Sequence, residues 1–214
     1  MNRALKDACL LVIDVQNDFC HGGSLEVKDG EAVVPVINGL SKRFFNVVAT
    51  QDWHPADHLS FASNHPGKRV NDVVNLLGIE QVLWPDHCVA GSHGADFHPD
   101  LDTTGFSLIV RKGRRKEIDS YSAFFENDRK TPTGLHGYLK DTGVKELYLC
   151  GLATDYCVYY SAMDAVKLGY GVYLVEDAVR GVDFPQGNIE RSISRMKEAG
   201  VILISSSRLN NNLP

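Results

Sequence analysis

Long hydrophobic runs are absent from this sequence. The apolar stretch near the N-terminus ends at Ile13, is followed directly by Asp14, and is too short to span a bilayer. No leader with a basic start and an apolar centre precedes it. We therefore expect a protein that is neither inserted in a membrane nor exported.

Positive charge is also scarce. The chain has 22 Lys and Arg against 27 Asp and Glu, which gives a formal net charge of -5. Phosphate backbones and anionic lipid repel such a surface, so we expect neither nucleic acid nor a membrane as partner. The basic exception is a cluster that we interpret mainly as a solvated loop: Arg111, Lys112, Arg114, Arg115 and Lys116.

Cysteine pairs and glycine-rich nucleotide motifs are missing as well. The five cysteines form no C-x-x-C pair and no even-numbered framework, so we expect free thiols in a reducing cytoplasm. The sequence has no G-x-G-x-x-G, Walker A or G-x-S-x-G segment, so no motif supports a dinucleotide fold, a P-loop or a serine hydrolase. With 214 residues, 43% apolar and 23% charged, the chain suits one globular domain over residues 1–214.

Short apolar runs alternate with helical segments along the chain. The runs predict strands over residues 8–13, 46–50, 107–111, 145–150, 171–175 and 201–204. Helices are expected over 31–45, 134–141, from the Cys157 region to about 168, and over 187–199. Unbroken apolar strands are typical of a sheet covered on both faces, and the alternation with helices favours parallel pairing. We therefore predict an α/β fold of three layers, α/β/α, with a six-stranded, mostly parallel sheet.

Two segments stand outside this alternation. Residues 51–105 are rich in Pro, His, Asp and Gly and show no sustained periodicity. Long irregular segments in compact domains are usually functional or disordered, and Trp53 and Trp84 argue against disorder here. We expect an active-site segment over about 51–105 and a polar, loosely held tail over about 205–214.

The segment Gly151–Val158 carries the strongest chemical signal. It follows the apolar run 147–150 and precedes apolar residues at helical spacing, which places Cys157 in the first turn of a helix after a strand. Thr154 is the expected N-cap. The free amides and the helix dipole favour a thiolate there and could hold an oxyanion beside it. We therefore expect a nucleophile for acyl transfer.

Other polar residues are predicted at the same rim of the sheet. Ligand sites in parallel sheets lie outside the carboxyl ends of the strands. Asp14 ends the first strand, Asp52 and His54 follow the second, Lys112 ends the third and Cys157 follows the fourth. Each alone is more often a structural residue, but together they offer a thiol nucleophile, an ammonium group and a proton-carrying carboxylate.

Asp52 and His54 also suggest a metal site. Residues i and i+2 of an extended segment point the same way, and His87 could complete a set of two imidazoles and one carboxylate. Such a set suits zinc, iron(II) or manganese(II). His58 and His65 are further candidates. The alternative is that these are ordinary hydrogen-bonded surface histidines.

Several motifs now occur together in one order. They are VIDVQNDF at Val12–Phe19, TQDWHP at Thr50–Pro55, WPDHCV at Trp84–Val89, GADFH at Gly94–His98, and the Gly151–Val158 segment. With these motifs the chain resembles, from Leu10 to about Ile204, the nicotinamidases (pyrazinamidases) of the isochorismatase-like hydrolase superfamily.

This resemblance implies a complete set of site residues. Asp14, Lys112 and Cys157 would be the catalytic triad, and the amides of Ala153 and Cys157 the oxyanion hole, with a cis peptide bond before Ala153. The remaining roles are metal ligation by Asp52, His54 and His87, and an aromatic-ring pocket walled by Phe19, Leu25, Trp84 and Tyr121. The implied cofactor is one divalent metal ion, Zn²⁺ in preference to Fe²⁺ or Mn²⁺.

The implied activity is that of an amidohydrolase acting on linear amide C–N bonds. It would hydrolyse nicotinamide, and pyrazinamide as well, to the acid and ammonia through a cysteine thioester, as a step of NAD salvage. The metal would bind the ring nitrogen and orient the carboxamide, while Asp14 would carry the thiol proton to ammonia. The oligomeric state is left open, with a homo-oligomer among the alternatives.

Two positions differ from the pattern of some family members. Tyr156 stands where some carry histidine, and His58 lies closer to His54 than the further metal-binding histidine that some possess. We therefore place His58 beside the ligand set, where it could support a bound water.

Other functions remain open at this stage. A hydrolase of the same superfamily that acts on carbamoyl or ureido groups would use the same triad, although it would not need the metal set. An isochorismatase proper would not need the Cys157 thiol. A redox-sensing domain would use Cys157 with a resolving cysteine, but Cys150, the nearest in sequence, is predicted to be buried. A metal-stabilised structural domain would unfold on chelation.

Overall fold

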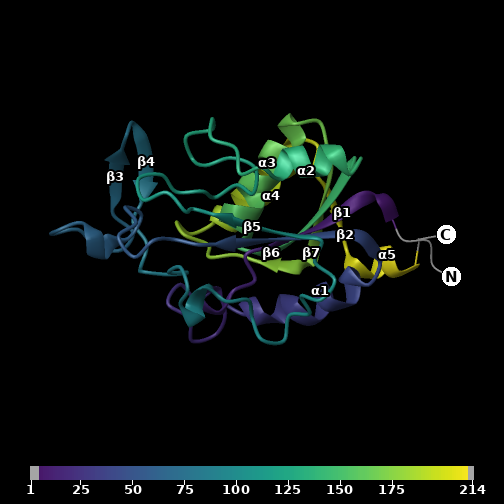
Figure 1. The fold of residues 1–214 in the computed structure, drawn as a ribbon, viewed down its shortest axis with the longest axis horizontal. Helices are drawn as coiled ribbons and strands as arrows, with labels where there is room; N and C mark the ends of the chain where they lie inside the picture. Colours follow the sequence, from purple (N-terminus) through teal and green to yellow (C-terminus); the bar gives the residue numbers. More distant parts are fainter. Residues whose placement is uncertain (1–4, 212–214) are drawn as a thin grey trace.

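A six-stranded sheet forms the central layer of the computed structural model, which describes residues 5–211 (Figure 1). Its strands follow the order β5-β2-β1-β6-β7-β8, and every neighbouring pair is parallel. Their bounds are β1 Leu5–Ile13, β2 Phe44–Asp52, β5 Leu108–Lys112, β6 Glu146–Leu152, β7 Gly171–Arg180 and β8 Ile202–Ile204. The predicted fold class and the predicted number of strands in this sheet are confirmed.

Helices cover both faces of the sheet. On one face lie α1 Val33–Ser41 and α5 Ser206–Asn211, and on the other α2 Leu135–Asp141, α3 Tyr159–Lys167 and α4 Asn188–Glu198 (Figure 1). The helix expected over 31–45 ends earlier, because the chain enters β2 at Phe44. Within residues 5–211, none of the helices is long and apolar enough to cross a membrane.

The expectation of a loose tail from about residue 205 is wrong for the part that the structure describes. Residues 206–211 form α5, and Leu209 is buried against the sheet. The backbone amide and hydroxyl of Ser206 both donate to the carboxylate of Asp177, which caps this helix. Residues 212–214 of the predicted tail lie outside the described part.

Strand β1 shows why its sequence lacks alternation. Leu10 and Val12 pack into the core beneath α1, whereas Leu11 and Ile13 pack into the core beneath α3. All four side chains are fully buried. Both faces of the strand therefore demand apolar residues, as in other parallel sheets covered on both sides.

The segment between β2 and β5 is more ordered than its composition suggests. It contains an antiparallel hairpin, β3 Val73–Leu76 and β4 Ile79–Val82, which projects from the body of the molecule (Figure 1). These strands are too short and too exposed to produce a clear pattern. Single turns of 3-10 helix complete the connections at Asn17–Phe19, Gly30–Ala32, Ala62–Asn64 and His93–Ala95.

The order of the strands creates a crevice at their carboxyl ends. The chain moves from β1 to β2 and β5 on one side, then returns to build β6, β7 and β8 on the other side of β1. The connections after β1 and β6 therefore diverge, and such a point is where α/β sheets bind ligands. Asp14 follows β1 and the Cys157 turn follows β6 at this point.

Candidate active site and metal centre

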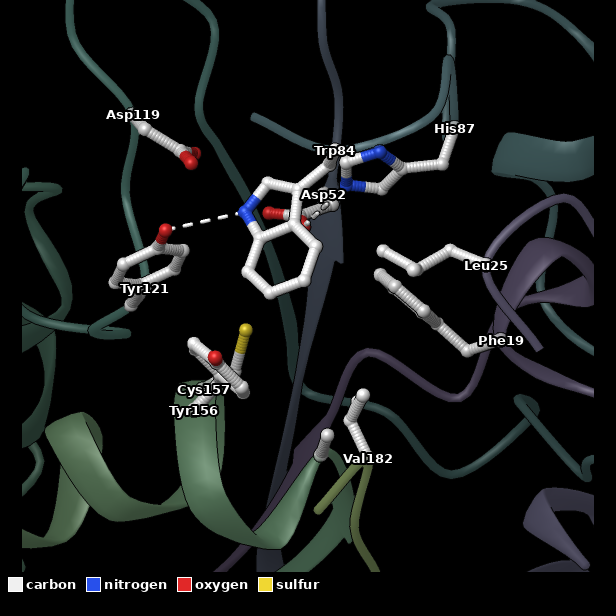
Figure 2. A pocket seen from close by; sticks show the side chains of 11 residues that line it. Phe19, Leu25, Asp52, Trp84, His87, Asp119, Tyr121, Tyr156, Cys157 and Val182 are labelled. Carbon is white, nitrogen blue, oxygen red and sulfur yellow. Dashed lines mark hydrogen bonds and ion pairs between the residues drawn. The ribbon is translucent and has the colours of Figure 1, made fainter. Parts of the chain in front are cut away.

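The cysteine turn begins where β6 ends. The peptide bond between Leu152 and Ala153 is cis, as the resemblance implied. A turn of π-helix, Thr154–Val158, then leads into α3, and the Cys157 sulfur points from it into a pocket (Figure 2). The prediction that Thr154 is the N-cap is wrong: Ala153 holds that position, and within residues 5–211 the turn has no side-chain cap.

Lys112 joins the predicted triad into one buried cluster. Its Nζ lies 2.8 Å from Asp14 Oδ2, 3.4 Å from Cys157 Sγ and 2.8 Å from the Ser120 carbonyl oxygen. It also lies 2.5 Å from Asp52 Oδ1. The last contact was not predicted from the sequence. It links the triad directly to a candidate metal ligand.

Burial controls the protonation of this cluster. Burial raises the pKa of the Cys157 thiol well above its ordinary value, and the nearby Lys112 ammonium offsets only part of this effect. The pKa of Asp14 is also raised by burial, against the opposing attraction of Lys112. The sequence-based expectation of a thiolate favoured by the helix start is therefore outweighed. The resting sulfur is a thiol that needs a base, and Asp14 lies beside the same ammonium group.

The predicted metal ligands converge on one point. Asp52 Oδ2 is 3.5 Å from His54 Nε2 and 3.8 Å from His87 Nε2. Nδ1 of His54 is 2.8 Å from the carbonyl oxygen of Gly113, and Nδ1 of His87 is 2.8 Å from that of Pro85. When each Nδ1–H donates to its carbonyl, each Nε2 offers a lone pair toward Asp52. The donor set fits a divalent metal ion.

Two observations on His54 support this fit. Its Nε2 is buried and, among residues 5–211, has no hydrogen-bond partner. Gly113, with φ +63°, packs against the ring so closely that an added Cβ would lie 2.4 Å from Cε1. The chain thus places glycine where any other residue would displace the imidazole.

His58 lies beside this set, in a second overlapping group. It is fully buried, its Nδ1 is 2.7 Å from Ser60 Oγ, and its Nε2 has no partner within the described residues. Candidate donor atoms of His54, His58 and Asp119 lie within 4.8 Å of one another. His65 belongs to none of the candidate metal groups found within residues 5–211, and its Nε2 is 2.8 Å from the Leu59 carbonyl oxygen.

A narrow pocket joins the thiol to the metal ligands, as Figure 2 shows. It is lined by Phe19, Leu25, Asp52, Trp84, His87, Asp119, Tyr121, Ala153, Tyr156, Cys157 and Val182. The four walls named from the resemblance are all among these residues. Aromatic faces therefore enclose a slot that has a sulfur nucleophile and a carboxylate–imidazole set along it.

Some lining residues were not predicted. Asp119 belongs to no motif, and only its position seven residues after Lys112 could have drawn attention to it. Val182 follows the carboxyl end of β7, where the rim rule could have placed it. The Asp155 carboxylate holds this loop through the amides of Val182, at 2.9 Å, and Asp183, at 3.0 Å.

Comparison with known proteins agrees with this geometry. An isochorismatase domain matches residues 8–208. The nicotinamidase of Acinetobacter baylyi is 47% identical over 203 residues, which cover 95% of this chain and 94% of that protein. A solved nicotinamidase and pyrazinamidase from Acinetobacter baumanii is 48% identical with a TM-score of 0.94, covering 97% of this chain and 100% of that one.

Two further similar structures contain small ligands. A protein from L. infantum in complex with nicotinate is 40% identical, with a TM-score of 0.84 and coverage of 97% of this chain and 96% of that one. The pyrazinamidase of Pyrococcus horikoshii in complex with zinc is 34% identical, with a TM-score of 0.76 and coverage of 93% and 99%. Given a domain match over nearly its whole length and relatives at this identity, the chain belongs to the isochorismatase family.

Proposed function

We propose that this protein hydrolyses nicotinamide to nicotinate and ammonia. The observation that carries the proposal is the narrow aromatic slot between Trp84, Tyr121 and Phe19, with the Cys157 sulfur opening into it (Figure 2). A planar ring fits such a slot, and its carboxamide would then face the thiol. The names and the nicotinate complex of the similar proteins support the same substrate.

The residues of the cluster divide the chemistry among themselves. Asp14 accepts the proton of the Cys157 thiol as the sulfur attacks the amide carbon. The backbone amides of Ala153 and Cys157 stabilise the oxyanion. The C–N bond then breaks, and Asp14 returns the proton to the departing ammonia. Water, deprotonated by Asp14, cleaves the thioester to release the acid, while Lys112 balances the negative charge.

Asp52, His54 and His87 would hold a divalent metal ion, for which Zn²⁺ is our first choice and Fe²⁺ and Mn²⁺ are alternatives. The zinc complex of the similar pyrazinamidase supports this choice. Bound there, the ion supplies a Lewis acid for a ring nitrogen and so orients the ring. His58 would lie beside the ion and bind one of its waters.

Ammonia release tests the proposal. The wild-type protein, loaded with metal, is incubated with nicotinamide beside Cys157→Ala and Cys150→Ala. Cys150 is a fully buried cysteine of β6 that does not line the pocket, so its variant controls for loss of a thiol elsewhere. We expect release by the wild type and Cys150→Ala and none by Cys157→Ala. A folded, metal-loaded wild type without activity would favour a carbamoyl-type hydrolase instead.

Three further properties follow from this proposal. Pyrazinamide, a planar aromatic amide of similar size, should also be a substrate. The biological role would be NAD salvage. The compartment would be the cytoplasm, where the cysteines, all five of them free in the described residues, would stay reduced.

A further inference from the structure

A buried amide connects the exposed hairpin to the wall of the pocket. Gln81 of β4 is only 2% exposed, although Leu77 at the turn of the same hairpin is 75% exposed. Gln81 belongs to none of the motifs in the sequence and does not itself line the pocket. A buried polar side chain in such a position needs hydrogen-bond partners.

The partners of Gln81 are residues that line the pocket. Its Nε2 lies 3.1 Å from Asp119 Oδ2, 3.1 Å from the Tyr121 hydroxyl oxygen and 2.8 Å from the carbonyl oxygen of Val82. The Tyr121 hydroxyl also accepts from Trp84 Nε1 at 3.1 Å, the bond drawn in Figure 2. One amide group therefore connects Asp119 directly to Tyr121, and through Tyr121 to Trp84.

The acceptor capacity of Tyr121 makes this connection specific. A phenol oxygen has two acceptor positions, and donors from Gln81 and Trp84 point at this one. Loss of the Gln81 amide would leave Tyr121 tied on one side only and would remove a donor from the buried Asp119 carboxylate. Tyr121 and Trp84 lie across the slot from Phe19 and Leu25 (Figure 2). A shift of either ring would change the width of the slot.

We propose that Gln81 is a positioning residue that sets the binding of the aromatic ring by fixing Tyr121, Trp84 and Asp119. This inference rests on the proposed nicotinamide hydrolysis. The Lys112 ammonium group holds the triad through contacts with Asp14 and Cys157 that do not involve Gln81. The effect of Gln81 therefore falls on KM and leaves kcat nearly unchanged. If Gln81 only anchored the hairpin, its loss would lower Tm and leave KM as it is.

Steady-state kinetics with nicotinamide separate these roles. Gln81→Met keeps the length of the side chain without its donor, and Gln81→Glu places a carboxylate against Asp119. Glu80→Gln, on an exposed neighbour in the same strand, is the matched control. For Gln81→Met we expect KM to rise about 5- to 20-fold, the loss of a buried hydrogen bond, with kcat within about threefold of wild type. Gln81→Glu should raise KM further, and the control should match the wild type.

Several outcomes would overturn the proposal. They are an unchanged KM in folded Gln81→Met, a lower Tm with unchanged KM, and a fall confined to kcat. If Gln81→Met does not fold, Tyr121→Phe removes the same hydrogen bond from the other side and must raise KM, or the proposal fails. A metal-loaded wild type that releases no ammonia from nicotinamide overturns the proposed function and this inference together, whereas an active wild type isolates the test of Gln81.

Discussion

Replacement of Lys112 by methionine would remove the cation that the buried cluster shares. In the native structure its ammonium group contacts Asp14 and Asp52, and all three side chains are almost completely buried. Methionine fills a similar volume, so the main change is electrostatic. Two carboxylates would remain in the interior without this counter-charge.

The expected loss of stability is large. Removing one partner of a buried ion pair costs about 3–5 kcal/mol, because the remaining charge stays desolvated. For a chain of this length, each kcal/mol corresponds to a shift in Tm of about 2–4 °C. We therefore expect Lys112→Met to melt about 6–20 °C below the wild type and to lose its amidase activity.

The loss should depend on pH in a defined direction. Burial raises the pKa of Asp14 above its ordinary value, and Lys112 opposes this shift, so its removal raises the pKa further. A carboxyl with a folded-state pKa above its unfolded value costs no stability while both states are protonated. The cost begins near the unfolded pKa of about 4 and is complete above the folded pKa. The difference from wild type should therefore be larger at pH 8 than at pH 5.

Thermal unfolding of metal-loaded protein at pH 5, 6, 7 and 8, followed by circular dichroism, measures this difference. Lys116→Met is the matched control, because Lys116 makes an exposed pair with Asp57 and should leave Tm unchanged. Equal melting of Lys112→Met and wild type would refute the argument from buried charge. A deficit of the same size at pH 5 and pH 8 would refute the role of carboxyl protonation.

Other substitutions probe the remaining contacts. Asp14→Asn should abolish ammonia release with an unchanged circular dichroism spectrum, since an amide cannot carry the proton; a normal rate would remove Asp14 from the mechanism. His54→Ala should lower bound metal in elemental analysis, and unchanged stoichiometry would exclude it as a ligand. Gln16→Leu removes side-chain bonds to the amide and carbonyl of Asp52 and to the Ala95 carbonyl, which costs about 1–3 kcal/mol per buried group left unpaired; an unchanged urea midpoint would contradict this.

The sequence determined much of the site because the chemistry follows strand ends. Asp14, Lys112 and Cys157 come from three strands far apart in the chain, yet alternation of strands and helices already predicts one shared rim. Asp52 and His54 are neighbours but one, so their joint orientation is a local property of extended backbone. Local periodicity and spacing can be read directly from a sequence, and these predictions depend on nothing else.

Other features depended on packing between distant segments. The contact of Lys112 with Asp52 joins two strands, and the Gln81 amide reaches Tyr121 across 40 positions in the sequence. Leu209 is buried because α5 docks on the sheet, which its polar sequence did not predict.

Cys157 shows the same division within a single residue. Its place in the first turn after β6 is a matter of local sequence, and that place alone favours a thiolate. The pKa of the thiol nevertheless rises, because the surrounding chain excludes water from the sulfur. The sequence by itself determined the fold class and the identity of the reactive groups. Tertiary structure decided their protonation and the bonds that hold them, since desolvation and long-range contacts exist only once the chain has packed.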